Sequence, residues 1–386
     1  MTPEEILPDE LLERMRSRAA GYDQENSFFH EDLAELAAAG YLKIFVPESD
    51  GGLGLGLEAV AGLQRRLATA APATALAINM HLVWTGVARV LAGRGDDSLR
   101  FVLKEAGQGE IFAFGISEAG NDSMLFDSGT TAEPKEAGGY AFTGRKIFTS
   151  LSPGWTRLGI FGKDTTARDG EGELVFGFIQ GNEPGYRTLD DWDTLGMRAS
   201  QSNTTVLDGA LIPADRIFRK LPVGPSQDPL VFAIFACFET LLAAVYTGIA
   251  ERAFTLAVQA ARRRSSAKYG GRSFAQDPDI RWKIAEAAMA MDAIQPHLAS
   301  VARDVDELVD HGAQWFPKFV GLKVRATENA RTIVDVAIRV SGGSSYFRGS
   351  ELERLYRDVL AGVFHPSNDE SAHATVASAW LGPLEM

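Results

Sequence analysis

One carboxylate interrupts the most apolar stretch of the chain. Glu239 is the only charged residue between Asp228 and Glu251. An ionised carboxylate inside an apolar helix is costly unless it is paired or serves a reaction. Removal from water raises the pKa of such a group, which suits a general base that takes a proton in a dry cleft. Glu239 therefore has two interpretations, a catalytic base or a structural carboxylate that an arginine or a serine satisfies.

Two of the six histidines have apolar neighbours. His81 lies in AINMHLVW and His365 lies in AGVFHPSN. An imidazole changes its charge near neutral pH, so either side chain could assist a reaction, and either could instead be structural. We assign no role to the four histidines with polar surroundings, which are His30, His297, His311 and His373.

The charge balance and the cysteine content argue against several classes of protein. The 386 residues carry a net charge of −13, so the chain as a whole is repelled by nucleic acid and by anionic lipid. An anionic cofactor needs only a local basic cluster, and RRRSSAKYGGR, from Arg262 to Arg272, is one. The single cysteine, Cys237, lies in an apolar run, which indicates a buried thiol and rules out a disulfide framework or a cysteine-rich metal site within this chain.

The sequence gives no sign of export or of a membrane span. The N-terminal residues MTPEEILPDELLERM are acidic and lack the order of positive charge and apolar run that a signal peptide needs. The segment from Asp228 to Phe254 is nearly as long and as apolar as a membrane-spanning helix. However, Glu239 lies in its middle and would be costly in lipid. We therefore predict a buried helix there and a cytoplasmic protein without membrane contacts.

The sequence pattern, and with it the predicted type of secondary structure, changes twice along the chain. Residues 1–108 carry apolar residues at helical spacing and predict an N-terminal helical domain. Residues 109–224 hold short β-branched and aromatic segments separated by turns, which predict a compact antiparallel β-domain. Helical patterns return over residues 225–386, and such segregated layers define an α+β fold. The helices expected in this last region span roughly 230–264, 278–309, 315–341 and 351–362.

Four local motifs follow one another in a meaningful order. They are GISEAGNDS (115–123), GRKIFTSL (144–151), LGMRASQSNTTVLDGALIPADRIF (195–218) and RVSGGSSYFRGSELERLYRD (339–358). Each motif is weak alone, but the four together, on a helix–sheet–helix background, resemble the acyl-CoA dehydrogenase superfamily over nearly the whole chain. The resemblance implies an N-terminal helical domain, a middle antiparallel β-domain, a C-terminal four-helix bundle, and assembly into a homodimer or homotetramer.

The same resemblance implies a flavin held between the β-domain and the bundle. Ser117 and Ser123 match hydroxyl residues that would meet the pyrimidine ring and the phosphate together with neighbouring backbone N–H groups. Phe148 matches the aromatic residue that covers the ring face, and Ser150 matches the hydroxyl residue at N5. Thr149 is one residue away and could exchange roles with Ser150. Taken singly, these are also ordinary turn and strand residues.

Further matches concern the other end of the cofactor. Gly342 and Gly343 would let the backbone approach the pyrophosphate or the adenine closely, although a glycine pair can also end a helix. The family's pyrophosphate-binding arginine is blurred in RRRSSAKYGGRSF, where Arg264 or Arg272 could serve with changed spacing. FAD is therefore the expected cofactor, and FMN, which needs no adenine-side contact, is the alternative.

The location of the catalytic base separates two possible reactions. The family's usual glutamate position, counted from RLYRD, falls on Pro366, which cannot take a proton. Some family members carry the glutamate on the first long helix of the bundle instead, where the match falls on Phe238, one residue before Glu239. We place first an acyl-CoA dehydrogenase in which Glu239 removes the α-proton while the β-hydride passes to FAD. An electron-transfer partner would then reoxidise the cofactor.

The alternative reaction uses the same fold. Two-component flavin monooxygenases resemble acyl-CoA dehydrogenases throughout, lack the glutamate and receive reduced FMN or FAD from a partner reductase. Histidines near the flavin ring assist them in activating oxygen or the substrate. His365 and His81 fall close to such histidines, and the alternative is therefore a monooxygenase acting on a small molecule with O₂. A catalytically inactive scaffold is a third possibility, whereas a hydrolase is disfavoured because no nucleophile or metal motif is present.

Overall fold

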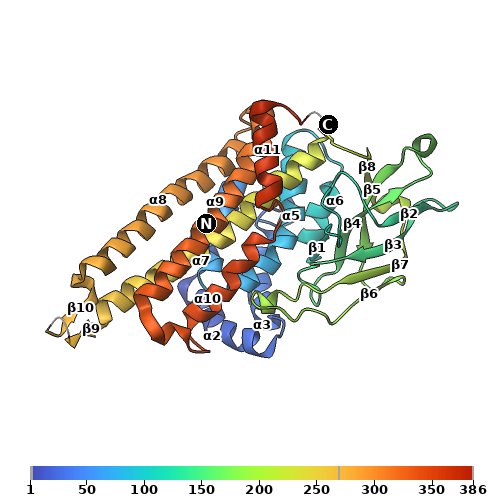
Figure 1. The fold of residues 1–386 in the computed structure, drawn as a ribbon. Helices are drawn as coiled ribbons and strands as arrows, with labels where there is room; N and C mark the ends of the chain where they lie inside the picture. Colours follow the sequence, from blue (N-terminus) through green and yellow to red (C-terminus); the bar gives the residue numbers. More distant parts are fainter. Residues whose placement is uncertain (1–2, 268–269, 385–386) are drawn as a thin grey trace.

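Residues 3–267 and 270–384 are described by a computed structural model, and they form N-terminal helices, a central sheet and C-terminal helices (Figure 1). α5 is apolar on nearly every face because it packs against α4, α6, α7 and β1. The N-terminal helices are α1 (Pro3–Ile6), α2 (Asp9–Glu25), α3 (His30–Ala38), α4 (Leu57–Ala68), α5 (Pro72–Gly93) and α6 (Arg100–Gly107).

The central sheet has eight strands, with β6-β7-β3-β2-β4-β5-β8 in spatial order and β1 beside β4. β1 and β2 pair with β4 in parallel, whereas the other pairings are antiparallel. The sequence predicted a purely antiparallel sheet. A parallel pair needs a connection longer than a hairpin, and residues 116–156 supply one between β1 and β4. The strands are β1 (Phe112–Gly115), β2 (Thr131–Pro134), β3 (Tyr140–Lys146), β4 (Arg157–Asp164), β5 (Glu173–Gln180), β6 (Tyr186–Thr188), β7 (Thr205–Ile212) and β8 (Ile217–Pro222).

The sheet meets the N-terminal helices through Trp84 of α5. The fully buried indole donates its Nε1–H to the carbonyl oxygen of Ala113 over 2.9 Å. It also packs against Gly159 of β4, where a Cβ atom would collide with the ring. The glycine therefore allows the helix to approach the sheet closely, which brings α5 next to the strands that surround the candidate site.

The C-terminal helices pack around α9, which contacts α7, α8, α10 and α11. Asp228 and Asp277 cap α7 and α8 by accepting backbone N–H groups, and a proline follows each of them at the first helical position. α11 was not predicted, because within it only Ala372 is buried and no apolar stripe marks it. These elements are α7 (Pro229–Arg263), a small hairpin of β9 (Ser265–Ser266) and β10 (Arg272–Ser273), α8 (Pro278–Asp306), α9 (Trp315–Ser341), α10 (Glu351–Val359) and α11 (Asp369–Leu381).

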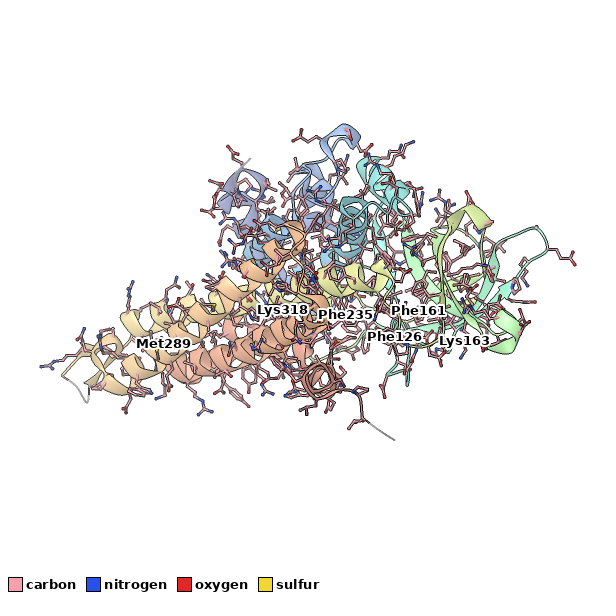
Figure 2. All side chains as sticks on the ribbon, turned by 90° about the horizontal axis from the view of Figure 1, so that it is seen from above. Phe126, Phe161, Lys163, Phe235, Met289 and Lys318 are labelled. Carbon is pink, nitrogen blue, oxygen red and sulfur yellow. The ribbon has the colours of Figure 1, made fainter. Side chains whose placement is uncertain are left out.

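The protein is elongated when it is seen from above (Figure 2). Phe161 and Lys163 of the sheet lie at one end and Met289 of α8 lies toward the other, with Phe235 and Lys318 between them. The sheet gives way to the C-terminal helices between Pro222, where β8 ends, and Pro229, where α7 begins.

Within residues 3–267 and 270–384, two helices, α5 and α7, are long and apolar enough to cross a membrane by length and composition alone. In each of them more than four fifths of the most apolar window is buried inside the protein, at 89% for α5 and 83% for α7. Buried core helices have this composition, as the glutamate in the middle of α7 led us to expect.

Candidate active site

A mainly apolar cavity of about 290 Å³ lies where the sheet meets the C-terminal helices. Side chains from α5, β1, α7, the loops of the sheet and the segment after α10 surround it. Among these described lining residues there is no aspartate or glutamate. The wall consists of Leu76, Met80, Phe114, Ser117, Phe148, Ser150, Trp192, Thr194, Leu195, Gly196, Met197, Ser202, Phe238, Arg357, Leu360, Ala361, Phe364, His365 and Pro366.

One edge of the cavity carries hydroxyl groups. Ser117 lines it, and no hydrogen bond of this hydroxyl is found among the described residues. The Ser150 hydroxyl lies 2.7 Å from that of Ser202, which in turn lies 2.7 Å from that of Ser200. This edge can therefore offer rotatable donors and acceptors to a polar ligand edge. Ser117 and Ser150 were both predicted to be cofactor-binding residues.

Aromatic rings form a wall next to these hydroxyl groups. Phe148 follows β3 in the left-handed backbone region, with φ of 55°, and its side chain is 53% exposed. Trp192 meets it edge-on, with ring centroids 6.1 Å apart. A bulky residue seldom adopts a positive φ, and such strain persists at sites where a particular side-chain direction is needed. The expected ring-covering residue thus lines the cavity with its face accessible.

Two of the predicted cofactor-binding residues lie outside the cavity wall. Thr149 is fully buried, and its hydroxyl has no hydrogen-bond partner among the described residues. Ser123 is exposed, and its backbone N–H binds the side chain of Asn121 over 2.9 Å. The structure therefore brings Ser117, Phe148 and Ser150 together, but neither Thr149 nor Ser123 joins them at the wall.

A buried ion pair holds the loop that carries Ser117. The carboxylate of Glu118 accepts hydrogen bonds from Lys146 over 2.6 Å and from the Thr130 hydroxyl over 2.6 Å. It also accepts hydrogen bonds from the Ser128 hydroxyl and from the backbone N–H groups of Gly129 and Thr130. Burial alone would raise the pKa of Glu118, but the charge of Lys146 and these hydrogen bonds lower it to about 2.

His365 is the histidine that lines the cavity. Its Nε2 atom lies 2.8 Å from the hydroxyl oxygen of Tyr246, which is fully buried on α7. Tyr246 has no other hydrogen-bond acceptor among the described residues, so we assign its O–H as the donor, which places the ring proton of His365 on Nδ1. Burial and the charge of Lys323 lower the pKa of His365 to about 3, so the imidazole is neutral at neutral pH.

Glu239 faces the helix bundle rather than the cavity. Its neighbour Phe238 lines the cavity, whereas Glu239 is 2% exposed and accepts the N–H and the hydroxyl of Ser367, both over 3.0 Å. Burial raises the pKa of the Glu239 carboxyl, and the positive charge of Lys323 opposes this rise. Its second carboxylate oxygen has no hydrogen-bond partner among the described residues. In this geometry the carboxylate fixes the segment behind the cavity.

Lys323 of α9 holds the same segment from the other side. Its fully buried amino group donates to the carbonyl oxygens of Gly362, His365 and Ser367, over 2.9, 2.7 and 2.9 Å. Three N–H donors for three acceptors is the geometry of an ammonium group, and Glu239 provides the opposite charge. Charges from α7 and α9 therefore converge on residues 362–367, which carry His365.

His81 lies outside the cavity wall, and backbone groups occupy both of its ring nitrogens. Nε2 lies 2.7 Å from the carbonyl oxygen of Leu42, and Nδ1 accepts the N–H of Phe112 over 3.1 Å. This pair of contacts fixes the tautomer with the proton on Nε2. Burial lowers the pKa of His81 to about 4. No ring nitrogen is left for a substrate, which is the structural alternative that the sequence left open.

Gly342 and Gly343 lie at the end of α9, away from the cavity wall. Gly342 has φ of 71°, and a Cβ atom there would collide with the guanidinium group of Arg264. Arg264 donates to the carbonyl oxygens of Val340 and Ser341, which are the last carbonyls of the helix. The glycine pair thus ends the helix and makes room for an arginine.

Three residues that shape the site were not predicted from the sequence. Tyr246 lies in the apolar run of α7, and Trp192 lies in a polar loop, so neither had a distinguishing pattern. Lys323 did have one, because it follows the buried Phe319 by four residues and precedes the buried Ala326 by three. A lysine on the apolar stripe of a helix indicates a buried cation with a specific partner.

The cavity residues fit a flavin. A planar ring with one polar edge and two apolar faces requires hydroxyl or N–H groups on one side and aromatic or aliphatic walls on the others. Ser117 and Ser150 supply the first, and Phe148, Trp192 and Met80 supply the second. The unpartnered hydroxyl of Thr149, next in sequence to Phe148, is a further buried polar atom available near this edge.

Comparison with known proteins agrees with this fit. Residues 9–100 match the family model of the acyl-CoA dehydrogenase N-terminal domain, and residues 240–370 match that of the C-terminal domain. The L-evernosamine nitrososynthase of Micromonospora sp. (strain ATCC 39149 / NRRL 15099 / SCC 1413) is 30% identical over 371 residues, which cover 92% of this chain and 84% of the relative. The putative acyl-CoA dehydrogenase YdbM of Bacillus subtilis (strain 168) is 28% identical over 373 residues, which cover 96% and 94%.

A solved structure gives the same picture. The structure of KijD3 in complex with FMN and dTDP-3-amino-2,3,6-trideoxy-4-keto-3-methyl-D-glucose superposes with a TM-score of 0.84 at 29% identity, covering 97% of this chain and 92% of that one. Fold and relatives together define the class, which is that of the flavin-dependent enzymes with the acyl-CoA dehydrogenase fold. The chain belongs to the acyl-CoA dehydrogenase family.

Proposed function

We propose that this protein is a flavin-dependent monooxygenase that oxidises a small molecule with O₂. The observation that supports this most is the cavity wall, which presents His365 and Pro366 but no carboxylate. Removal of an α-proton, as dehydrogenation requires, needs a carboxylate within reach of the substrate. Glu239 is instead hydrogen-bonded to Ser367 on the far side of this wall. The order of the two reactions expected from the sequence is therefore reversed in this proposal.

Residues at different positions around the cavity have different roles in this proposal. Bound flavin supplies the redox chemistry, with electrons from a partner reductase. Phe148, Trp192 and Phe238 surround the site with apolar surface and exclude water from it. The pKa of His365 is so low that the imidazole carries no second proton at neutral pH. We therefore assign His365 the role of a hydrogen-bond donor through Nδ1, oriented by Tyr246.

The substrate class follows from the relatives only as a proposal. One relative is named as a nitrososynthase of L-evernosamine, and others are named as amino sugar nitrososynthases. We therefore propose an amine-bearing small molecule as the first substrate class to test.

The choice of cofactor can be argued from Arg264. This arginine was a candidate for the adenine-side pyrophosphate contact, but it is bound to the carbonyl oxygens of Val340 and Ser341. We therefore place FMN before FAD. Extraction of the cofactor and its separation by chromatography would decide between them, and the same preparation would show whether the protein is the expected homodimer or homotetramer.

The test of the proposed function supplies reduced FMN enzymatically, ¹⁸O₂, and a panel of amino sugars and their nucleotide derivatives. The expected result is a product that gains ¹⁸O and a His365→Ala variant whose rate falls about 10²- to 10⁴-fold. Glu239→Gln should lower the rate only mildly. Flavin reduction by an acyl-CoA under anaerobic conditions, lost in Glu239→Gln and kept in His365→Ala, would overturn the proposal.

Acyl-thioester dehydrogenation with FAD is the second candidate. Two observations favour it: YdbM, a putative acyl-CoA dehydrogenase, is 28% identical over nearly the full length, and burial raises the pKa of Glu239 one residue from the cavity. This candidate requires the Glu239 side chain to leave Ser367 and enter the cavity. The anaerobic acyl-CoA arm of the same experiment tests it directly.

A further inference from the structure

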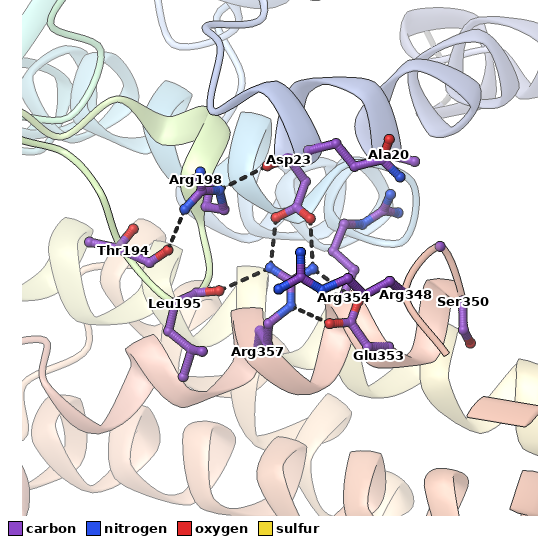
Figure 3. A pocket seen from close by; sticks show the side chains of 12 residues that line it. Ala20, Asp23, Thr194, Leu195, Arg198, Arg348, Ser350, Glu353, Arg354 and Arg357 are labelled. Carbon is purple, nitrogen blue, oxygen red and sulfur yellow. Dashed lines mark hydrogen bonds and ion pairs between the residues drawn. The ribbon is translucent and has the colours of Figure 1, made fainter. Parts of the chain in front are cut away.

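A second pocket, which we call a hollow, has a volume of about 480 Å³, adjoins the cavity and has several arginines in its wall (Figure 3). α2, the loop around residues 194–198 and the start of α10 enclose it. Thr194, Leu195 and Arg357 belong to the walls of both hollows, so the two hollows lie side by side. The arginines in its wall are Arg198, Arg348, Arg354 and Arg357.

Two of these arginines donate hydrogen bonds to partners within the protein. Arg357 lies between Asp23 and Glu353 and donates to both carboxylates over 2.6 to 3.0 Å (Figure 3). Arg198 donates to the Asp193 carboxylate and to the carbonyl oxygens of Asp23 and Thr194, over 2.8 to 2.9 Å. The two carboxylates in the wall, Asp23 and Glu353, are thus both committed to Arg357.

Arg348 and Arg354 have no such partner. No hydrogen bond or ion pair of either guanidinium group is found in the described part of the chain, and Arg354 is only 6% exposed. The charge of Arg354 acts on Asp358 without an ion pair between them, and the Asp358 carboxylate accepts the backbone N–H of Met197. A buried guanidinium group without a hydrogen-bonded anion is costly, and such a group persists where a ligand supplies the anion.

We propose that this arginine pocket binds a phosphate or diphosphate group of a ligand whose remainder lies in the adjoining cavity. A guanidinium fork matches two phosphate oxygens, and two unpaired arginines match the charge of a diphosphate. The nine-residue helix α10 begins at the pocket, and its cap residue Ser350 leaves its hydroxyl free of the first-turn N–H groups. A positive pocket on a chain of net charge −13 selects a small anion rather than a polyanion.

Two ligands could carry this phosphate, namely the flavin itself and a nucleotide-linked substrate. The second source deepens the proposed function, because it would make the substrate a nucleoside diphosphate derivative. Binding is measured without turnover, so a failure of the arginine pocket and a failure of the proposed reaction are distinguished.

The experiment titrates inorganic pyrophosphate into the full-length protein by calorimetry and compares Arg354→Gln, Arg348→Gln and a control, Arg303→Gln. Arg303 lies exposed on α8 and lines neither hollow. We expect Arg354→Gln to weaken pyrophosphate binding by about 10- to 100-fold and Arg348→Gln by about 3- to 10-fold. Arg303→Gln should bind as the unaltered protein does, and Arg354→Lys should keep part of the affinity because it keeps the charge.

A second comparison identifies the source of the phosphate. If FMN binds more tightly than riboflavin and Arg354→Gln removes this advantage, the cofactor carries the phosphate. If the advantage persists while pyrophosphate still binds the FMN-saturated protein, the substrate carries it. Absence of pyrophosphate binding, or equal binding by Arg354→Gln when circular dichroism shows that variant folded, would overturn the inference.

Discussion

The Nζ atom of Lys323 lies 2.7 Å from the carbonyl oxygen of His365, so a buried ammonium group fixes the backbone of the histidine in the cavity wall. The same amino group holds Gly362 and Ser367, and Glu239 binds Ser367 from α7. The two charges that sequence patterns place on separate helices therefore act on one short segment. Their role in this geometry is to position the imidazole rather than to touch a substrate.

Removing both members of this pair should destabilise the protein by less than the sum of the two single changes. Lys323→Met leaves Glu239 as an uncompensated buried charge and three carbonyls without donors, which should cost about 3 to 5 kcal/mol of unfolding free energy. Adding Glu239→Gln removes that charge, so the double variant should lose less than the sum of the single variants. Urea unfolding of all four proteins measures this coupling. Simple additivity would mean that the two residues do not act as a pair.

Tyr246→Phe should separate the orientation of His365 from its presence. The variant removes the hydroxyl that lies 2.8 Å from Nε2 and keeps the ring. We expect turnover to fall about 2- to 12-fold, less than in His365→Ala, because a single hydrogen bond of this kind contributes about 0.5 to 1.5 kcal/mol. A variant as inactive as His365→Ala would instead indicate that the tyrosine itself contacts the substrate.

The pH dependence of the unaltered enzyme gives an independent check on His365. Because the pKa of His365 is lowered to about 3, the imidazole stays neutral from neutral pH down to that value, and turnover should show no acid limb near pH 6.5 from this group. The unfolded chain binds the proton below about 6.5, so the contribution of His365 to stability decreases as pH falls from 6.5 toward 3. An acid limb near 6.5 that disappears in His365→Asn would contradict this.

Acid stability should depend on Glu118. Its pKa is lowered to about 2 in the fold, so its carboxylate contributes stability that is present above the unfolded value near 4.5 and is lost as pH falls toward 2. Glu118→Gln should remove this dependence and also leave the buried Lys146 without its anion, at a cost of about 3 to 5 kcal/mol. Unfolding free energies between pH 2 and pH 7 test both effects. Lys146→Met provides the reciprocal variant.

Gly196→Ala should disturb both hollows at once. A Cβ atom at Gly196 would collide with the backbone of Arg357 and Asp358, so the loop must move away from α10. We expect a loss of about 1 to 3 kcal/mol in stability and weaker flavin and pyrophosphate binding. Gly62→Ala is the matched control, because no atom lies near its Cβ position inside α4, and it should stabilise the protein by about 0.5 to 1 kcal/mol. Equal behaviour of the two variants would refute the proposed role of this close approach.

Phe148→Ala should weaken flavin binding without unfolding the protein. The side chain is half exposed at the cavity, so the change costs little internal packing but removes the ring that would cover the cofactor. A decrease in affinity of about 5- to 30-fold is expected from the loss of aromatic contact. Leu211→Ala, at a similarly exposed position of β7 outside the cavity, should leave flavin affinity unchanged. Fluorescence titration with FMN measures both variants.

Sequence patterns alone predicted the helix–sheet–helix order and the approximate bounds of α7, α8, α9 and α10. Apolar spacing and capping residues act over a few residues, so the pattern that predicted a helix at 315–341 needed no tertiary information. The four motifs likewise placed Ser117, Phe148 and Ser150 at one site, because each lies in a segment with a recognisable local pattern. α11 and the parallel pairings of β1 and β2 were not predicted, because neither feature produces a periodic pattern in the sequence.

The directions in which the chemical groups face depend on the packing of the whole chain. Glu239 and Phe238 are adjacent in sequence, yet a helix turns by about 100° per residue, and Phe238 meets the cavity while Glu239 meets the bundle. His81 and His365 looked alike as histidines with apolar neighbours, but backbone groups from Leu42 and Phe112 occupy the first and leave the second at the wall. Burial and partners come from residues far away in the chain, so the sequence could name these side chains but could not assign their roles.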